Sequence, residues 1–511
     1  MATESAKNSV IHHWFGGSEQ AGTSGKTLEV TNPATGEVTG TMVVADQADA
    51  AAVIAAAKEA SQTWGRSSIT TRAKVMFRFR ELLEAKKDEL AAIITREHGK
   101  VHSDALGEIA RGLEVVEFAC GIPHLLKGGY SESVSTGVDV HSIRQPLGVV
   151  GVISPFNFPA MVPMWFFPVA IACGNTVVLK PSEKDPSASI WIARLWQEAG
   201  LPDGVFNVLQ GDKVAVDALL QSPDVAAISF VGSTPIAQYV YDQGTAAGKR
   251  VQALGGAKNH MLVLPDADLD AVANAAVSAG YGSAGERCMA ISVVVAVDPI
   301  GDELVARIAD RTGGIKVGDG ARGSDGPEAD MGPLVTREHA DKVLDYIRQG
   351  EQAGAKVVVD GRAPQVNGAE AGYWVGPTLF DHVSPDMSIY TEEIFGPVLS
   401  VVRVGSYREG LDLINANQYG NGTAIFTGDG AAARLFENEV QVGMVGINVP
   451  IPVPMAYYSF GGWKRSLFGD THAHGTEGVH FFTRGKVVTS RWGDPAARRS
   501  QGIDLGFPQN D

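Results

Sequence analysis

Four short apolar runs, separated by segments of helix length, constrain the fold of this 511-residue chain more than any other feature. The runs are rich in Val and Ile and occupy residues 149–153, 176–179, 206–209 and 226–231. Strands that are buried on both faces read as continuous apolar runs, and a helix between consecutive strands makes them parallel. The spacing therefore predicts a parallel α/β sheet.

A second set of apolar runs follows the first. Residues 261–264, 291–296 and 398–402 repeat the pattern, which predicts a second α/β unit with a boundary near residues 255–258. Upstream, the alanine-rich stretch 45–95 has helical periodicity and predicts a helical N-terminal region. Near the other end, residues 484–490 predict a strand that needs an edge to pair with, and another subunit could supply that edge.

Composition excludes several classes of function. The formal net charge of −16 argues against nucleic acid or an anionic membrane as the main partner, because both need concentrated Lys and Arg. The most apolar run, residues 161–172, is shorter than the ~20 residues that span a bilayer. It predicts a buried helix or a loop wall. The first ten residues lack the features of an export signal, so we expect a cytoplasmic enzyme.

The chain has three cysteines, which are too few and too scattered for a disulfide framework or a zinc site. We therefore expect a reducing compartment and no metal. Cys120 and Cys173 lie in apolar surroundings and are expected to be structural. Cys288 differs, because small residues at 282–285 allow a ligand to approach and Arg287 favours the thiolate. The motif alone is equally consistent with Cys288 as a nucleophile and with Cys288 as a small buried residue.

Polar residues follow three of the predicted strands, at the edge where ligands of open α/β sheets gather. Asn157, held between two prolines, is either a rigid amide donor for an oxyanion or part of a capped turn. Lys180 and Glu183 suit the hydroxyls of a ribose or form a solvated ion pair. Residues 232–234 open a helix where a diphosphate could bind, although they do not match the Gly-x-Gly-x-x-Gly fingerprint.

Two further motifs are ambiguous when taken alone. Gly255 and Gly256 form a lone glycine pair. The segment from Glu393 through Phe395 precedes a predicted strand, and it presents either a carboxylate and an aromatic wall to a ligand or a strand cap and a core contact.

Together, in this order and at these separations, the motifs resemble the aldehyde dehydrogenase superfamily over most of the chain. The resemblance implies an α/β fold with a Rossmann-like NAD-binding domain at residues 1–128 and 147–256. It also implies an α/β catalytic domain at 257–450 and a bridging β element for oligomerisation at 129–146 and 478–495. A homotetramer built as a dimer of dimers is the implied assembly.

The same resemblance implies roles for individual residues. Cys288 is the nucleophile that attacks the aldehyde, and Asn157 holds the oxyanion. Glu183 disfavours a 2′-phosphate, so NAD is expected over NADP. The implied cofactor-binding residues are Ser154, Phe156, Lys180, Glu183, Lys184, Ser233, Gly255, Glu393 and Phe395.

The chain departs from the hydrolytic members of that superfamily at one position. Those members carry a glutamate immediately before Leu-Gly-Gly, where it activates water against the thioester, and here the residue is Ala253. The thiol of coenzyme A is then the expected nucleophile, because a thiolate attacks a thioester readily. The alternative is a hydrolytic semialdehyde dehydrogenase, acting for example on succinate semialdehyde, with Glu286 or another group as the base.

Within the superfamily, the segments around Lys258, Cys288, Asn157 and Lys464 are similar to those of the CoA-acylating methylmalonate-semialdehyde dehydrogenases. This implies NAD-dependent oxidation of methylmalonate or malonate semialdehyde, with decarboxylation, to propionyl-CoA or acetyl-CoA. Valine, inositol or β-alanine breakdown is the implied pathway.

The substrates implied by that resemblance carry a carboxylate, for which it points to Arg111 and Arg287. The alternative for Arg111 is an ion pair with Glu108 or Glu114 on a helix surface. A protein that has lost turnover is a third class of function. Retention of the nucleophile, the amide and the cofactor residues argues against it.

Overall fold

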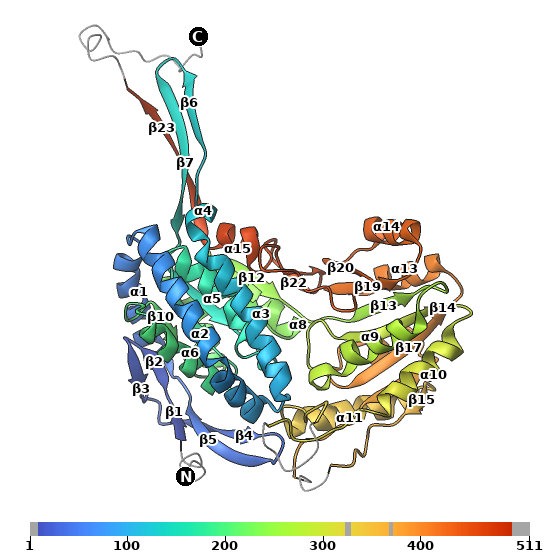
Figure 1. Cartoon of the computed structure of the whole chain (residues 1–511). Helices are drawn as coiled ribbons and strands as arrows, with labels where there is room; N and C mark the ends of the chain where they lie inside the picture. The colour runs from blue at the N-terminus through green and yellow to red at the C-terminus, as the bar shows by residue number, and fades with distance from the viewer. Residues whose placement is uncertain (1–8, 322–328, 367–370, 493–511) are drawn as a thin grey trace, which may run out of the picture.

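The structure, a computed structural model, describes residues 9–321, 329–366 and 371–492. Figure 1 shows two lobes, each built on its own sheet, and a narrow three-stranded sheet that stands away from the first lobe. Helices flank both large sheets, so the predicted α/β fold is confirmed.

The first lobe contains an eight-stranded sheet in the order β22-β12-β11-β8-β9-β10-β2-β3. Its five central strands are parallel. They are β8 (Val149–Ile153), β9 (Thr176–Lys180), β10 (Phe206–Val208), β11 (Val225–Val231) and β12 (Arg250–Leu254). The antiparallel edge strands are β2 (His13–Phe15), β3 (Ser18–Gln20) and β22 (Leu467–Phe468). All four predicted strands are confirmed. The order of the chain through the sheet reverses at β8, and such a reversal opens a crevice at the carboxyl ends of the strands.

Alternate side chains of β8 enter two different cores, as the period of a strand requires. Val150 and Val152 pack on one side, and Val149 and Ile153 pack on the other. The first core is covered mainly by α2 (Ile69–His98), α3 (His102–Cys120), α5 (Met161–Ala172) and α6 (Ser187–Glu198). The second is covered by α1 (Gln47–Trp64), α7 (Lys213–Gln221) and α8 (Thr234–Ala246). Burial of both faces explains why the strands read as continuous apolar runs.

The most apolar run of the sequence forms α5, and each of its residues is buried. Of the two predicted alternatives for residues 161–172, a buried helix and a loop wall, the structure therefore shows the buried helix. No helix among the described residues has the length and apolar character to cross a membrane. The predicted helical N-terminal region is also confirmed, because it forms α1 and α2.

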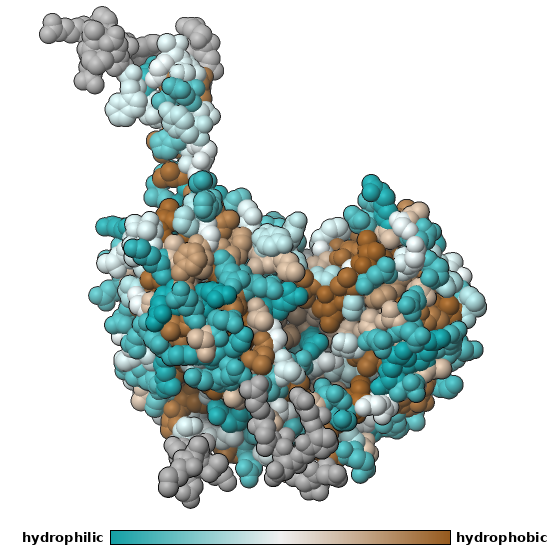
Figure 2. All heavy atoms as spheres, viewed as in Figure 1, coloured by the Kyte–Doolittle hydropathy of each residue, from teal (hydrophilic) through white to brown (hydrophobic). Residues whose placement is uncertain are grey.

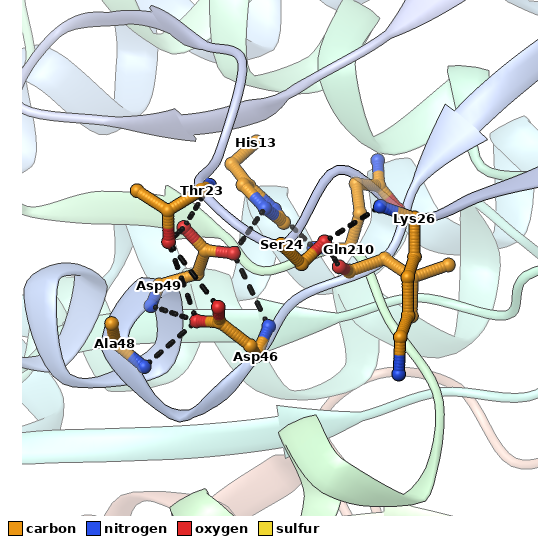
Figure 3. A network of polar contacts seen from close by, with 9 residues as sticks. His13, Thr23, Ser24, Lys26, Asp46, Ala48, Asp49 and Gln210 are labelled. Atoms are coloured by element: carbon orange, nitrogen blue, oxygen red, sulfur yellow. Dashed lines mark hydrogen bonds and ion pairs between the residues drawn. The ribbon is translucent and has the colours of Figure 1, made fainter.

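The segment before α1 contains strands that the sequence did not predict. The strands β1 (Ser9–Ile11), β5 (Glu37–Val43) and β4 (Thr27–Asn32) form a small sheet of their own. Figure 3 shows how polar contacts tie the segment to α1 and to the end of β10. The backbone N–H of Thr23 donates to Asp49 at 2.7 Å, and that of Gln210 donates to His13 at 3.1 Å. Asp46 caps α1 by accepting from the N–H groups of its first turn.

The second lobe contains a seven-stranded sheet in the order β15-β16-β17-β14-β13-β19-β20. Its strands are β13 (Asn259–Val263), β14 (Ile291–Val297), β15 (Lys356–Val359), β16 (Thr378–Asp381), β17 (Val398–Val404), β19 (Gly422–Phe426) and β20 (Met444–Ile447). Its helices are α9 (Leu269–Tyr281), α10 (Gly301–Thr312), α11 (Arg337–Gln352), α12 (Ser388–Thr391), α13 (Tyr407–Ala416) and α14 (Gly430–Glu439). The predicted strands of the second unit are β13, β14 and β17.

The projecting sheet has the order β23-β7-β6 and consists of β6 (Tyr130–Ser135), β7 (Val138–Pro146) and β23 (Thr483–Arg491). The predicted terminal strand is β23, and the edge it pairs with is β7 of its own chain, from Thr483 opposite Pro146 to Arg491 opposite Val138. The outer edges of β6 and β23 have no partner strand among the described residues. Figure 2 shows hydrophobic residues, among more polar ones, on the part of this sheet next to the first lobe.

The remaining elements join these parts. The short helices α4 (Ile122–Leu125) and α15 (Gly475–Phe481) lie at the base of the projecting sheet, and β18 (Tyr419–Gly420) pairs with β21 (Trp463–Lys464). Residues 451–477, outside the predicted domains, include β22, which completes the first sheet. Residues 1–8, 322–328, 367–370 and 493–495 of the predicted domains lie outside the described residues. The domain boundaries themselves stay a prediction.

Replacing Phe79 by alanine is expected to lower the free energy of unfolding by about 3–5 kcal/mol, because it opens a cavity among aromatic rings. Phe79 is fully buried, stacks on Trp196 at 3.6 Å between ring centroids and meets Phe167 edge to face. Chemical denaturation measures the change. Phe77→Ala on the same helix is the control, since Phe77 is 55% exposed and its loss should cost less than about 0.5 kcal/mol. Equal losses in the two variants would contradict the packing described.

Candidate active site

Cys288 lies in a tight loop between α9 and β14. A 3₁₀ turn, η2 (Gly282–Gly285), holds Ser283 and Ala284 in the left-handed region with φ of 53° each. Gly285 also has a positive φ, and a Cβ at this position would lie 2.2 Å from the carbonyl oxygen of Gly396. Only glycine tolerates this approach, which is why small residues precede the cysteine.

Two asparagines of the second lobe hold the backbone of the cysteine loop. The carbonyl oxygen of Cys288 accepts from Nδ2 of Asn259 at 2.9 Å and from Nδ2 of Asn421 at 3.1 Å. Cys288 is partly exposed, whereas the other two cysteines are buried and free. Burial raises the pKa of Cys120 to about 11 and that of Cys173 to about 12, as expected for structural cysteines.

Asn157 connects the first lobe to this loop. It follows the carboxyl end of β8, is buried, and donates from Nδ2 to the carbonyl oxygen of Glu286 at 3.0 Å. The structure thus brings the predicted amide donor and the predicted nucleophile to one loop, although they lie 131 residues apart in the chain. The oxyanion role of Asn157 stays a prediction.

A pocket opens at the cysteine. Arg287, Cys288, Glu393 and Phe395 line it, and all four were predicted site residues. Lys258 lines it as well, although the sequence suggested no role for this lysine. The Lys258 ammonium donates to the carbonyl oxygens of Ile389 and Glu392 at 2.7 Å each, and so anchors the segment that carries Glu393.

The glycine pair allows three segments to meet beside Glu393. A carboxylate oxygen of Glu393 accepts from the N–H of Ala257 at 2.9 Å. A Cβ at Gly256 would lie 2.3 Å from the other oxygen, and a Cβ at Gly255 would lie 2.8 Å from the carbonyl oxygen of Arg465. The motif that was ambiguous in the sequence is therefore required by close packing.

Burial governs the ionisation of the pocket. Burial, followed by the nearby charge of Glu393, raises the pKa of the Cys288 thiol to about 12, while Arg287 acts in the opposite direction. Burial also raises the pKa of Glu393 to about 7, against the stabilising N–H of Ala257 and the charge of Lys258. Burial lowers the pKa of Lys258 to about 7. Burial therefore favours the neutral thiol form of Cys288, and Arg287 favours the thiolate.

The remaining predicted cofactor residues lie where β8, β9 and β11 end. Lys180 pairs with Glu183 at 3.2 Å, and Lys180 with other donors holds the pKa of Glu183 below its usual range even though burial opposes this. Ser154 presents a buried hydroxyl that has no partner among the described residues, as a site for a polar ligand would. The Lys184 ammonium lies 4.4 Å from the centre of the Phe156 ring.

Ser233 and Phe156 lie at the same edge of the first sheet. Ser233 is exposed at the N-cap of α8, where its side chain caps no N–H group of the helix. Phe156 packs edge to face on Phe395 at 5.9 Å, which joins the two lobes.

The two arginines predicted for a substrate carboxylate differ in position. Arg287 lines the Cys288 pocket and pairs with Asp104 at 2.8 Å. Arg111 pairs with Glu114 at 3.0 Å on the surface of α3, which is the alternative that the sequence left open. Glu108, the other candidate partner of Arg111, is buried and pairs with Lys100 instead. A substrate role for Arg111 stays a prediction.

Ala253 stands where hydrolytic family members carry the glutamate that activates water. Ala253 is fully buried in β12 and packs in the core beneath the sheet. Glu286, the suggested substitute, is also fully buried. One of its carboxylate oxygens accepts from the N–H of Val335 at 3.3 Å, and its two oxygens lie 3.7 Å from ring nitrogens of His98 and His339.

Glu286 and the two histidines form a cluster that no local sequence signal indicates, because its members lie on three distant segments. Burial raises the pKa of Glu286 to about 8 and lowers that of His339 to about 4. Among the described residues that line the Cys288 pocket, Glu286 is absent. No group of metal-binding side chains that could hold an ion occurs in the described part of the chain.

The chain belongs to the aldehyde dehydrogenase family, whose sequence profile matches residues 20–488. It is 55% identical over 499 residues to the malonate-semialdehyde dehydrogenase of Pseudomonas aeruginosa. That alignment covers 98% of this chain and 99% of the relative. It is 48% identical over 482 residues to malonate-semialdehyde dehydrogenase 1 of Geobacillus thermodenitrificans. That alignment covers 94% of this chain and 99% of the relative. The family expected from the motifs is confirmed.

Solved structures agree with these relatives. A methylmalonate-semialdehyde dehydrogenase of Oceanimonas doudoroffii is 54% identical, with a TM-score of 0.93 over 96% of this chain and 100% of that chain. A protein of Sinorhizobium meliloti 1021, described by the same name and solved with NAD, is 53% identical. It has a TM-score of 0.93 over 95% of this chain and 98% of that chain.

Alkylation of Cys288 by iodoacetamide, without NAD, is expected to respond in opposite directions to two substitutions. Glu393→Gln removes a negative charge, lowers the thiol pKa and speeds alkylation at pH 9 by roughly threefold to tenfold. At pH 6 the increase should vanish, because burial raises the pKa of Glu393 to about 7 and its carboxyl is then protonated. Arg287→Gln should slow alkylation. Mass spectrometry of the modified peptide follows the rate, and equal rates in all three proteins would contradict this electrostatic account.

Proposed function

We propose that the chain is a CoA-acylating, NAD-dependent semialdehyde dehydrogenase that converts methylmalonate semialdehyde to propionyl-CoA, or malonate semialdehyde to acetyl-CoA, with release of carbon dioxide. The relatives named for these two semialdehydes support the substrate. The observation that carries the choice of CoA is Ala253, a buried methyl group where hydrolytic members carry their base. Breakdown of valine, inositol or β-alanine is the proposed pathway.

In the first step, the Cys288 thiolate attacks the aldehyde carbon, and the carbonyl oxygen becomes an oxyanion. The Asn157 amide and the Cys288 backbone N–H stabilise this charge. The raised pKa of the thiol, caused mainly by burial, means that attack requires loss of its proton at the moment of reaction. The charge of Glu393, whose own pKa is raised by burial to about 7, contributes to the raised pKa of this thiol, and Glu393 supplies the carboxylate among the described residues that line the pocket.

The residues at the crevice fit NAD. Lys180 and Glu183 bind the adenosine ribose, Ser233 and the start of α8 bind the diphosphate, and Glu393 binds the nicotinamide ribose. The buried and unpartnered hydroxyl of Ser154 supports a polar ligand at this edge. Bound NAD accepts the hydride from the carbon attached to Cys288, which leaves a thioester on the enzyme. The Glu183 carboxylate repels a 2′-phosphate and so favours NAD over NADP.

The thiol of CoA then attacks the thioester, and Cys288 leaves as the thiolate. Glu286 is poorly suited to activate water instead, because its carboxyl group lies between His98 and His339 and accepts from Val335. Arg287, in the pocket, and Arg111 are the proposed partners of the substrate carboxylate. Loss of that carboxylate as carbon dioxide leaves the electron pair of the broken C–C bond on the α-carbon, which takes up a proton to give the final acyl-CoA.

NADH formation from methylmalonate semialdehyde and NAD is expected to be sustained only when CoA is present, and to yield propionyl-CoA. Absorbance at the NADH band and mass analysis of the products measure this. Without CoA, one equivalent of NADH per active site should form, because the thioester accumulates. Cys288→Ala should abolish NADH formation and keep the native thermal transition. Sustained turnover to a free acid without CoA would overturn the proposal in favour of the hydrolytic enzyme.

For the assembly, we propose a homotetramer, built as a dimer of dimers through the projecting sheet, in the cytoplasm. The open edges of β6 and β23 support association, because an exposed strand edge pairs readily with another chain. Exposed apolar side chains on this sheet include Tyr130, Val134, Ile143 and Val487. Three free cysteines suit a reducing compartment.

Val487→Asp is expected to shift the tetramer to smaller species, because it places a charge on a side chain that is 70% exposed in a single chain and buried in the proposed assembly. Sedimentation velocity measures the distribution. Leu435→Asp on α14 is the matched control, since Leu435 is 42% exposed and lies far from the projecting sheet. A tetramer that survives Val487→Asp would contradict the proposed interface.

A further inference from the structure

A buried ion pair lies behind the segment that carries Asn157. The Lys100 ammonium pairs with a carboxylate oxygen of Glu108 at 2.7 Å, and both side chains are 0% exposed. Lys100 follows the end of α2, and Glu108 lies on α3. Removing two charges from water costs several kcal/mol for each ion, so a pair in this position is poor evidence of a contribution to stability.

Both members of the pair bind the backbone of the Asn157 segment. Lys100 donates a second hydrogen bond to the carbonyl oxygen of Asn157, at 2.6 Å. The other oxygen of Glu108 accepts from the N–H groups of Ala160 at 2.8 Å and Met161 at 3.1 Å. These N–H groups open α5, whose N-cap residue provides no side-chain hydrogen bond. One ion pair therefore anchors the chain at Asn157 and again three residues later.

The same segment faces the cysteine loop. Beyond its anchored backbone, Asn157 donates from its amide to the carbonyl oxygen of Glu286, two residues before Cys288. Lys100 also lies 4.2 Å from the centre of the Phe158 ring. The backbone around Asn157 is thus held from behind by α2 and α3, while its amide projects toward the loop of the second lobe.

We propose that Lys100 and Glu108 are positioning residues, which fix the backbone of residues 157–161 so that the Asn157 amide is aimed at the oxyanion formed on attack by Cys288. The proposal rests on the proposed role of Asn157. An oxyanion hole gains most from donors that need no reorganisation when the charge develops, and two anchors on the donor's own backbone provide this rigidity.

A different lysine shows what a purely structural anchor looks like. Lys249 is buried and donates to the carbonyl oxygens of Ser222 and Val225, the latter at 2.7 Å. It precedes β12 at the amino end of the first sheet, away from Cys288. Lys249→Met is therefore the matched control, because it also removes a buried ammonium from backbone carbonyls.

The test is a double-mutant cycle on single-turnover NADH formation from methylmalonate semialdehyde, with saturating NAD and without CoA. Asn157→Ala and Lys100→Met should each slow this step, by up to about a hundredfold. In the Asn157→Ala background, Lys100→Met should add no further loss, because its target is gone. Glu108→Gln should behave in the same way. NAD affinity, measured by fluorescence titration, should stay within about twofold of the original protein.

The results distinguish a positioning role of Lys100 and Glu108 from a purely structural one. Equal losses from Lys100→Met with and without Asn157 would overturn positioning and leave a structural anchor. Slowing by Lys249→Met that also disappears in the Asn157→Ala background would overturn it as well. If Lys100→Met does not fold, Glu108→Gln alone completes the cycle. If Asn157→Ala leaves the step unchanged, the oxyanion role itself fails, and that outcome is distinct from failure of the positioning role.

Discussion

Helices cover both faces of the central strands, and this burial is the constraint on which the site depends. Because β8 has no exposed face, polar side chains can lie only where the strand ends. Asn157, Lys180 and Ser233 follow the carboxyl ends of neighbouring strands for this reason. Cys288 comes from the other lobe, in the loop before β14, so the candidate site lies where two independently buried sheets meet.

The contact between the lobes is made of backbone as much as of side chains. Asn157 reaches the carbonyl of Glu286, and Glu393 reaches the N–H of Ala257. Such contacts need small residues, which the glycines at 255, 256 and 285 provide. Burial is also the largest cause of the raised pKa values of Cys288 and Glu393. Geometry and ionisation of the pocket therefore have one physical origin.

Loss of the family's base is matched by the packing around it. An alanine methyl at 253 fits the core beneath β12, and the nearby acid Glu286 is held in a cluster with two histidines. The buried pair of Lys100 and Glu108 holds the backbone behind Asn157. The candidate site thus combines an alanine at the position of the family's base with buried anchors on the backbone behind Asn157.

The sequence by itself determined the parallel sheets and the set of motifs that contains Cys288, Asn157, Lys180 and Glu393, and it indicated that residues 161–172 are buried. Continuous apolar runs and short motifs depend on neighbouring residues, so they can be recognised without a structure. The five strands before α1 were missed because they are short and partly polar, and because their order comes from long-range contacts such as that of Thr23 with Asp49. Only the tertiary structure decided between Glu108 and Glu114 as the partner of Arg111, and only it brought His98, Glu286 and His339 together. His98, Glu286 and His339 lie on three segments whose separation along the chain carries no periodic signal, so their contact exists only in the packed structure.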